Sequence, residues 1–368
     1  MTTEITLDAA MQEQVFAFMA DPATHGGMSI RRIDTHAAVV FLAGDRALKV
    51  KRAVRFPFLD YSTLAKRKAA CDEEIRINRP GAPQIYRRVV AITQGHNGAL
   101  RIDGDGAIVE YAVEMARFDE NATLDHLAQA GALESSLIMD LADAIATSHQ
   151  AAPIVAADGW IRSIPSIISA NTIAFRASRR FPDRDIDALD TASQLAFTRI
   201  RPRLQERGHR GLVRRCHGDL HLANIVQIGR KPVLFDAIEF DPAIASIDIL
   251  YDLSFTVMDL LRYGRRAEAS ILLNRYLTAT FKENFDGLAT LPLFTSMRAA
   301  IRANVILARL SRAHRNEAST LLAARDYFSL AFRLISPTQP MLVAIGGLSG
   351  TGKSVLARAL AAALEPPP

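Results

Sequence analysis

The sequence predicts an α+β protein with a small strand-rich lobe, a larger helical lobe and a short βα fragment at the end. Three observations support this division. Runs of β-branched and apolar residues typical of strands gather in residues 1–117, helical periodicity dominates residues 118–336, and a proline-containing linker opens residues 337–368. We take these three ranges as the expected domains.

The composition is that of a folded globular protein. The chain has 368 residues, 49% of them hydrophobic, which is enough to bury a sizeable core. Its net charge of +5 favours anionic partners such as nucleotide phosphates, but no long basic tract with interleaved aromatics predicts nucleic-acid binding. No apolar run reaches membrane-spanning length, so no membrane partner is expected. The two cysteines, Cys71 and Cys216, form no CxxC pair, which fits a reducing cytoplasm.

The small lobe is expected to combine a hairpin, further strands and two helices. It opens with an amphipathic helix from Asp8 to Met19, whose apolar residues share one face. Two apolar runs on either side of a Gly-Asp turn then predict a β-hairpin, and a helix capped by Ser62 or Thr63 follows. The expected bounds are 8–19 and 62–78 for the helices, and 37–42, 47–51, 86–93 and 107–115 for the strands.

The second lobe is expected to be mainly helical, with short strands and loops over 213–236. Residues 176–184 are basic and rich in loop formers. The linker at 336–340 then precedes a short strand and a last helix. The expected helical ranges are 124–149, 189–207, three or four pieces within 244–334, and 354–364, and the expected strand of the fragment is 341–345.

The run from His217 to Asn224 predicts a phosphoryl-transfer site. Such a site needs a carboxylate to orient the acceptor hydroxyl and oxygen ligands for Mg²⁺. Asp219 is our candidate for the catalytic base. Asn224 lies five residues later, and Asp236 follows an apolar strand seventeen residues after Asp219, so these two are candidate metal ligands. ATP and Mg²⁺ are the expected cofactors.

Two segments resemble the signature motifs of the aminoglycoside phosphotransferase family. The first is Cys216–Ile225 and the second is Val233–Phe255. The resemblance spans about residues 30–335. It implies a bilobal protein-kinase-like fold and assigns the same roles to the base and the two metal ligands. It also implies that Asp248 and Asp252 fix the catalytic loop and cap the helix that follows.

The small lobe should supply a strand lysine for the nucleotide phosphates and a helix glutamate that holds it. Lys49 is the preferred lysine, and Lys51, on the same strand face, is the alternative. Glu74 is preferred over Glu73 because it shares a helix face with inward-facing residues.

The end of the last small-lobe strand is where a kinase hinge would bind adenine. Backbone groups of Glu114 and Ala116 are therefore candidate nucleotide contacts. No GxGxxG loop precedes this region, the catalytic loop contains HGD instead of HRD, and no APE-bounded activation segment follows. These differences favour a small-molecule kinase over a protein kinase.

A second phosphate-binding motif lies near the C-terminus. Residues 347–354 fit GxxxxGK[ST], with an expected strand before them and a helix after them. Its candidate nucleotide-binding residues are Gly347, Gly350, Gly352, Lys353 and Ser354. We expect this to be the first βα unit of a P-loop domain whose remainder lies outside the chain, as in bacterial two-domain proteins that join the two kinds of domain.

The sequence thus predicts an ATP-dependent phosphotransferase that acts on a hydroxyl group of a small molecule. A nucleotide-binding regulatory pseudokinase module with no acceptor is the alternative. The sequence identifies neither the acceptor nor the oligomeric state. Glu239 and Asp241 are the acids that could attract a cationic acceptor, although they could equally shape the metal loop.

Overall fold

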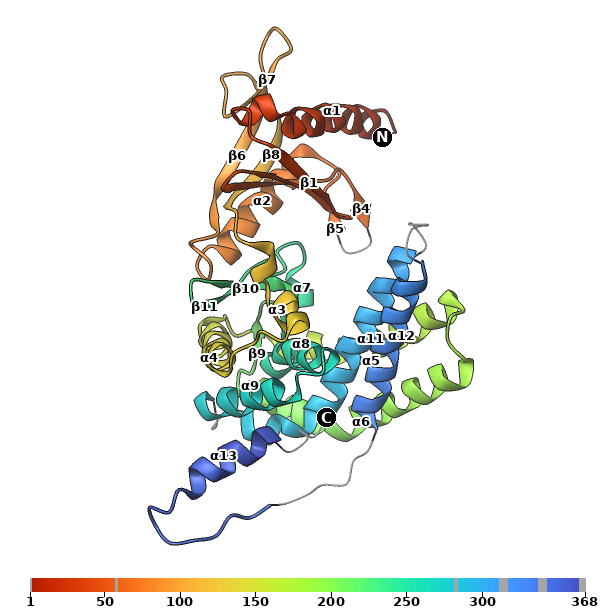
Figure 1. Cartoon of the computed structure of the whole chain (residues 1–368). Helices are drawn as coiled ribbons and strands as arrows, with labels where there is room; N and C mark the ends of the chain where they lie inside the picture. Colours follow the sequence, from red (N-terminus) through yellow and green to blue (C-terminus); the bar gives the residue numbers. More distant parts are fainter. Residues whose placement is uncertain (1, 57–58, 281–283, 311–316, 337–342, 364–368) are drawn as a thin grey trace. The chain divides into compact units, whose positions relative to one another are not determined.

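Figure 1 shows the computed structural model of the chain, in which residues 2–56, 59–280, 284–310, 317–336 and 343–363 are described. The chain forms two compact units. The first contains residues 1–122 and 233–242, and the second contains residues 123–232 and 243–368. The first unit therefore reaches Ala122 instead of residue 117, and it includes a segment that the sequence places in the helical lobe.

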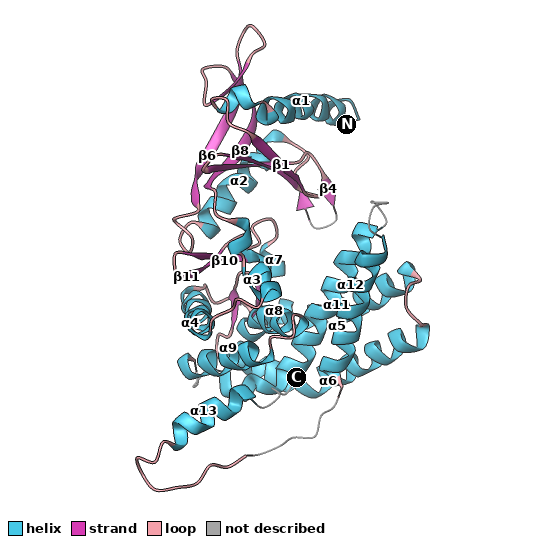
Figure 2. Ribbon diagram, viewed as in Figure 1, coloured by secondary structure: helices cyan, strands magenta, loops and turns pink. Residues whose placement is uncertain are grey.

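The first unit is built on a six-stranded sheet in the order β1-β2-β3-β8-β6-β7, with antiparallel neighbours throughout. The expected hairpin is present as β2 and β3. Figure 2 draws the strands in magenta and labels β1, β6 and β8 of this sheet. The strands are β1 (Ile30–Asp34), β2 (Ala38–Ala43), β3 (Arg46–Lys51), β6 (Tyr86–Gln94), β7 (Leu100–Ile102) and β8 (Ala107–Ala116).

Two helices cover opposite faces of this sheet. The helix α1 (Thr2–Ala20) packs Val15 and Phe16 against apolar side chains that include Leu48 and Val50 of β3. Because side chains alternate along a strand, Lys49 and Lys51 point to the other face, which α2 (Leu64–Asn78) covers. The sheet thus directs two lysines toward one helix.

Short elements complete the first unit. Thr63 is the N-cap of α2, where its hydroxyl accepts a hydrogen bond from the Lys66 N–H at 3.3 Å. The expected helix 62–78 is therefore present and begins at Leu64. The other elements are η1 (Pro22–His25), β4 (Arg55–Phe56), β5 (Leu59–Asp60) and η2 (Glu120–Ala122).

The second unit is largely helical. Its core joins α5, α6, α8, α11 and α12 through residues such as Phe175, Phe255 and Phe328. The helices are α3 (Leu124–Ala130), α4 (Ser135–Ala151), α5 (Ala157–Ser178), α6 (Asp183–His209), α7 (Pro242–Ala245), α8 (Ile249–Arg262), α9 (Arg266–Ala279), α11 (Leu291–Leu310), α12 (Glu317–Ile335) and α13 (Lys353–Ala363). The shorter elements are β9 (Val213–Arg215), η3 (Leu222–Asn224), β10 (Ile225–Ile228), β11 (Lys231–Leu234), β12 (Ser246–Asp248) and η4 (Phe285–Thr290).

Several expected helices differ from those observed. The range 124–149 is two helices, because Gly131 adopts φ +73° and ends α3. The basic region 176–184 contains the expected loop at 179–182, which is shorter than the region because α5 continues to Ser178 and α6 begins at Asp183. Pro165 lies inside α5, where a proline ordinarily argues against a helix. Within the described residues, no helix combines the length and the apolar character needed to cross a bilayer.

Candidate active site

A lysine and two acids meet in the first unit. Lys49 Nζ lies 2.9 Å from Glu74 Oε1 and 2.6 Å from Asp236 Oδ1. Glu74 is fully buried on α2, and Asp236 lies two residues after the end of β11. Glu73 points elsewhere and pairs with the exposed Arg76. The structure therefore places Glu74 beside the strand lysine.

The second lysine of β3 forms a separate, more deeply buried network. Lys51 is 2% exposed and forms ion pairs with both Glu74 and Glu239. The Tyr61 hydroxyl donates to Glu239 Oε1 at 2.9 Å, and its ring centroid lies 5.4 Å from Lys51 Nζ. Glu239, which the sequence offers as an acid for a cationic acceptor, is instead buried as a partner of Lys51.

The segment that begins at Asp236 is held from several sides. The Asp236 N–H donates to the Tyr86 hydroxyl oxygen at 3.0 Å, and the Ala237 N–H donates to Asn78 Oδ1 at 2.8 Å. Asp236 itself has φ +61°, a left-handed conformation that non-glycine residues seldom adopt. Such a conformation persists where the surroundings enforce it, and it is common at functional sites. Here it orients the carboxylate toward Lys49.

Electrostatic interactions keep the lysines and acids of this site charged. Burial alone would lower the pKa of Lys49, but the Asp236 and Glu74 carboxylates outweigh it and raise that pKa well above its ordinary value. Burial alone would raise the pKa of Glu239, but Lys51 and Lys49 hold it below its ordinary value. Burial alone would likewise lower the pKa of Lys51, but Glu74 and Glu239 outweigh it and raise that pKa, so both lysines and Glu239 are ionised at neutral pH.

The sheet limits the expected adenine contacts at the end of β8. Ala116 is paired with β3 on one side, and its N–H donates to the Ile85 carbonyl at 2.7 Å. The Glu114 side chain is 8% exposed and lies near three arginines, with its Oε1 3.0 Å from Arg46 Nε. A backbone N–H that already serves the sheet is not available to a base, so a contact of Ala116 with adenine could not use this N–H.

The catalytic loop lies in the second unit. Asn224 Nδ2 donates to the Asp219 carbonyl at 2.9 Å and to Asp219 Oδ2 at 3.1 Å. His221 Nε2 lies 3.4 Å from the same carboxylate oxygen. Burial alone would raise the pKa of Asp219, but His221, His217 and Arg302 outweigh it and hold that pKa well below its usual range. Asp219 is thus an ionised, partly exposed acceptor of hydrogen bonds.

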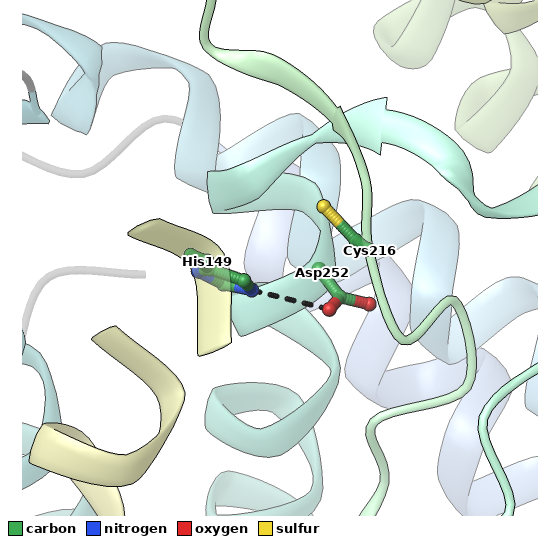
Figure 3. A group of neighbouring side chains, drawn as sticks. All are labelled: His149, Cys216 and Asp252. Atoms are coloured by element: carbon green, nitrogen blue, oxygen red, sulfur yellow. Dashed lines mark hydrogen bonds and ion pairs between the residues drawn. The ribbon is translucent and has the colours of Figure 1, made fainter. Parts of the chain in front are cut away.

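A buried carboxylate on α8 anchors this loop. Asp252 accepts the backbone N–H groups of His217 at 3.2 Å and of Gly218 at 2.9 Å, and His149 Nε2 lies 3.1 Å away (Figure 3). Gly218 has φ +85°, which glycine adopts without steric cost. The expectation that Asp252 fixes the loop is confirmed.

The side chains around Asp252 are of types that bind metals, but they already form hydrogen bonds with other groups of the protein. His149, Cys216 and Asp252 place one potential ligand atom each within 4.8 Å of one another. However, His149 Nδ1 is also bonded to the Tyr276 hydroxyl at 2.8 Å, and the Cys216 thiol faces the Ile247 carbonyl. Burial raises the pKa of the Cys216 thiol well above its ordinary value, which disfavours the thiolate that metals bind. This cluster supports the loop.

Asp248 has the capping role that the resemblance implies. It is the N-cap of α8, where its side chain accepts the Leu250 N–H at 2.8 Å. It also pairs with the fully buried Arg207, with Nε 2.8 Å from Oδ2. The helix that carries Asp252 is thereby fixed at its first turn.

The second phosphate-binding motif forms a loop in front of α13. Lys353 opens this helix, and its Nζ donates to the carbonyls of Gly347, at 2.7 Å, and Leu348. Gly350 and Gly352 both have φ +80°. The expected strand 341–345 is wrong for Val343–Ile345, which are irregular, and residues 341–342 lie outside the described residues. A strand needs a neighbour for its backbone groups, and the described residues provide none at this point.

The structure thus gathers the predicted residues into two groups. Lys49, Glu74 and Asp236 meet in the first unit, and Asp219 and Asn224 meet in the second. Sequence reasoning missed the side chains that support them. The missed supporting residues are Tyr61, Asn78, Tyr86, His149 and Asp259.

Comparison with curated proteins finds uncharacterized proteins of Mycobacterium tuberculosis and Mycobacterium bovis. They are 27% identical to this chain over 344 residues, which cover 89% of the chain. The chain spans 64% of the length of these relatives. No family model matches the sequence.

Kinases are among the solved structures that match this fold. A choline/ethanolamine kinase family protein from Mesorhizobium loti matches with a TM-score of 0.50 and 13% identity, over 96% of this chain and 98% of its own. An amicoumacin kinase solved with AMP-PNP and Ca²⁺ matches with a TM-score of 0.53 and 13% identity, over 92% and 98%. Choline kinase from Cryptosporidium parvum gives 0.50 and 10%, over 85% and 90%. The kinase-like fold that the sequence predicts is therefore confirmed.

Proposed function

We propose that the chain is an ATP-dependent, Mg²⁺-assisted phosphotransferase that transfers a γ-phosphate to a hydroxyl group of a small molecule. The observation that carries this proposal is the contact of Lys49 with both Glu74 and Asp236. In kinases a strand lysine must be held by a helix glutamate and accompanied by a metal-binding aspartate. The first unit brings together a strand lysine, a helix glutamate and an aspartate, each from a different segment of the sequence, and this supports the proposal.

Lys49 is the residue that would bind the nucleotide phosphates. Its side chain is 16% exposed, whereas that of Lys51 is 2% exposed and is held by Glu74 and Glu239. Phosphate oxygens can therefore replace Asp236 as partners of Lys49, while Glu74 continues to hold the lysine. Lys51 would stay in place and position the segment 236–239.

Asp236 and Asn224 fit the preferences of Mg²⁺ for oxygen donors. The Asp236 side chain is 43% exposed, so its carboxylate is accessible. Asn224 directs its amide nitrogen toward Asp219, which leaves its carbonyl oxygen for a cation. When bound, Mg²⁺ would neutralise the charge that develops on the phosphates.

Asp219 would orient the acceptor hydroxyl and take up its proton. Its lowered pKa keeps it ionised at neutral pH, so it can accept a hydrogen bond from an alcohol. Asp252 fixes the backbone beside it, and Asn224 holds its carboxylate. The proton that leaves the acceptor oxygen is received by an Asp219 carboxylate oxygen as the phosphoryl group arrives.

The test is Mg²⁺-dependent ATP turnover with matched variants. Asp219→Asn should lower turnover by about 10²- to 10⁴-fold and leave ATP binding unchanged. Asp236→Asn should weaken Mg²⁺-dependent ATP binding. Asp158→Asn, at an exposed position of α5, is the control that should behave as wild type. Turnover that survives Asp219→Asn would refute the assignment of the base, and ATP binding without any turnover in the wild type would favour the regulatory module.

We also propose that residues 347–354 bind phosphate weakly. Lys353 and Ser354 have the positions that such a loop requires, and the φ values of Gly350 and Gly352 suit its turns. However, residues 343–363 contain no acidic residue that could complete a Mg²⁺ site. This loop is therefore expected to contribute little hydrolysis of its own.

A further inference from the structure

Gln12 is a buried polar residue on the apolar face of the helix α1. It lies one turn before Phe16, which packs against the sheet. Its amide Nε2 donates to the Lys51 carbonyl at 2.9 Å and to Glu110 Oε2 at 2.8 Å, and its Oε1 accepts the Ala53 N–H at 2.8 Å. An apolar side chain would serve for packing alone, so the buried amide points to a role for these three bonds.

The bonds of Gln12 lie where the strand β3 loses one of its neighbours. The pairing of β3 with β8 ends at Val50, whereas its pairing with β2 continues to Lys51. Beyond Val50 the Gln12 side chain takes the place of a neighbouring strand, because it bonds a carbonyl and an N–H of the segment 51–53. The main chain that carries Lys51 is therefore held by β2 on one side and by α1 on the other.

The contact of Gln12 with Glu110 begins a chain of buried bonds that leads to α2. Glu110 lies between Gln12 and Arg67, whose Nε is 2.8 Å from Oε2 and 2.9 Å from Oε1 of this carboxylate. The Arg67 Nη1 then donates to the Tyr61 carbonyl at 3.1 Å. Arg67 and Glu110 are both buried, so each depends on the other for its charge partner.

The chain of bonds closes on the strand that carries the lysines. The Tyr61 hydroxyl donates to Glu239, and Glu239 pairs with Lys51. The Lys51 carbonyl returns the ring to Gln12. Glu239 lies three residues after Asp236, the proposed Mg²⁺ ligand. Loss of the Gln12 bonds would therefore loosen Lys51 and, through its partner Glu239, the segment that places Asp236.

We infer that Gln12 is a positioning residue of the nucleotide site, which holds the Lys51–Glu239 pair in place and thereby sets the affinity of this site for Mg²⁺. This inference rests on the proposed phosphotransferase function. It gives a role to the helix α1, which supplies none of the residues proposed to contact ATP, Mg²⁺ or the acceptor. The role concerns the metal more than the phosphates, because Lys49 lies within the part of β3 that β2 and β8 hold on both sides.

The experiment compares Gln12→Met with two control variants of α1 in the full chain. Gln12→Met keeps the length of the side chain and removes its three hydrogen bonds. Gln14→Met, at an exposed position, controls for the substitution, and Phe16→Leu controls for a loss of α1 packing. Calorimetry measures ATP binding at stepped Mg²⁺ concentrations and in EDTA, and thermal unfolding measures stability.

Gln12→Met should raise the Mg²⁺ concentration for half-maximal ATP binding by about 3- to 10-fold, which corresponds to the loss of one net hydrogen bond. ATP affinity in EDTA and at saturating Mg²⁺ should stay close to that of the wild type. Gln14→Met should match the wild type, and Phe16→Leu should lower stability without changing the Mg²⁺ requirement. An unchanged Mg²⁺ requirement in Gln12→Met, or an equal rise in Phe16→Leu, overturns the inference.

A second pair of variants decides the question if Gln12→Met does not fold. Gln12→Glu keeps an acceptor for the Ala53 N–H but places a carboxylate against Glu110, so it should raise the Mg²⁺ requirement. Adding Glu110→Gln restores a donor between the two side chains and keeps the number of charges, so the double variant should regain Mg²⁺ affinity. A double variant that binds Mg²⁺ no better than Gln12→Glu contradicts the inference.

These outcomes separate the inference from the proposed function. If every α1 variant has the Mg²⁺ requirement of the wild type and Asp219→Asn abolishes turnover, the function stands and the inference fails. If the wild type shows no Mg²⁺-dependent ATP binding and no turnover that depends on Asp219, the proposed function itself fails.

Discussion

The two lysines of β3 should have different effects when they are replaced one at a time by methionine. Lys51→Met leaves Glu239 and Glu74 buried with one counter-charge fewer, since both acids are less than 9% exposed. Removing one partner from a buried ion pair costs about 3–5 kcal/mol. Lys49→Met also removes one partner of the buried Glu74, but Glu74 keeps Lys51. The acid left without its lysine is Asp236, whose side chain is 43% exposed and can be hydrated. We expect a loss of about 1 kcal/mol there.

The effects on nucleotide binding should run the other way. If Lys49 meets the phosphates, Lys49→Met removes a charge-assisted interaction and weakens ATP binding by about 10- to 100-fold. Lys51→Met keeps Lys49 and Glu74 in contact and should weaken binding much less. The double variant Lys51→Met/Glu239→Gln removes both charges of one pair. It should be more stable than the sum of the single changes predicts, by about 1–3 kcal/mol.

The assay must follow the first unit by itself. Trp160 is the only tryptophan of the chain and lies in α5, so its fluorescence reports the second unit. Amide hydrogen exchange in β3 and α2 reports the first. We expect Lys51→Met to increase exchange in β3 and α2 strongly, Lys49→Met to increase it slightly, and the urea midpoint of Trp160 fluorescence to stay unchanged in both. Equal exchange in the two variants, or weaker ATP binding in Lys51→Met than in Lys49→Met, would refute the reasoning.

Three further predictions concern the loop anchor, pH and the second phosphate loop. Asp252→Ala should lower turnover by about 100-fold, because two N–H groups of the catalytic loop lose their acceptor. Steady-state kinetics would measure turnover, and calorimetry should show an unchanged affinity for ATP. Undiminished turnover would contradict this prediction. Because the pKa of Glu239 is lowered in the folded protein, its stabilising effect is complete above its ordinary value of 4.5 and is lost as pH falls through the lower folded-state value. As the pH falls, the wild type should therefore lose the protection of β3 amides from hydrogen exchange more steeply than the Glu239→Gln variant does. Parallel pH profiles of amide exchange in the two proteins would argue against this. Finally, Asp219→Asn/Asp236→Asn with Lys353 intact should show no measurable ATP hydrolysis, and residual hydrolysis that Lys353→Met abolishes would show that the second loop is active.

Local patterns in the sequence are sufficient to predict the strands and the helix that carry Lys49 and Glu74. The hairpin with Lys49 follows from two apolar runs and a Gly-Asp turn, and the helix with Glu74 follows from a threonine cap and a proline-glycine stop. The strand β1 was missed because its Ile-Arg-Arg-Ile-Asp sequence lies at the sheet edge and lacks strict alternation. The helix α5 was missed because Pro165 and a glycine near its start mask its periodicity.

The supporting residues could not be found in the same way, because their partners are distant in sequence. Asn78 bonds a peptide 159 residues away, and His149 bonds Asp252 across 103 residues. No local pattern encodes such pairs, since they arise only when helices and strands pack. The same limit applies to backbone groups: Ala116 has the sequence position of a hinge residue, but its N–H is used by the sheet, which only the fold reveals.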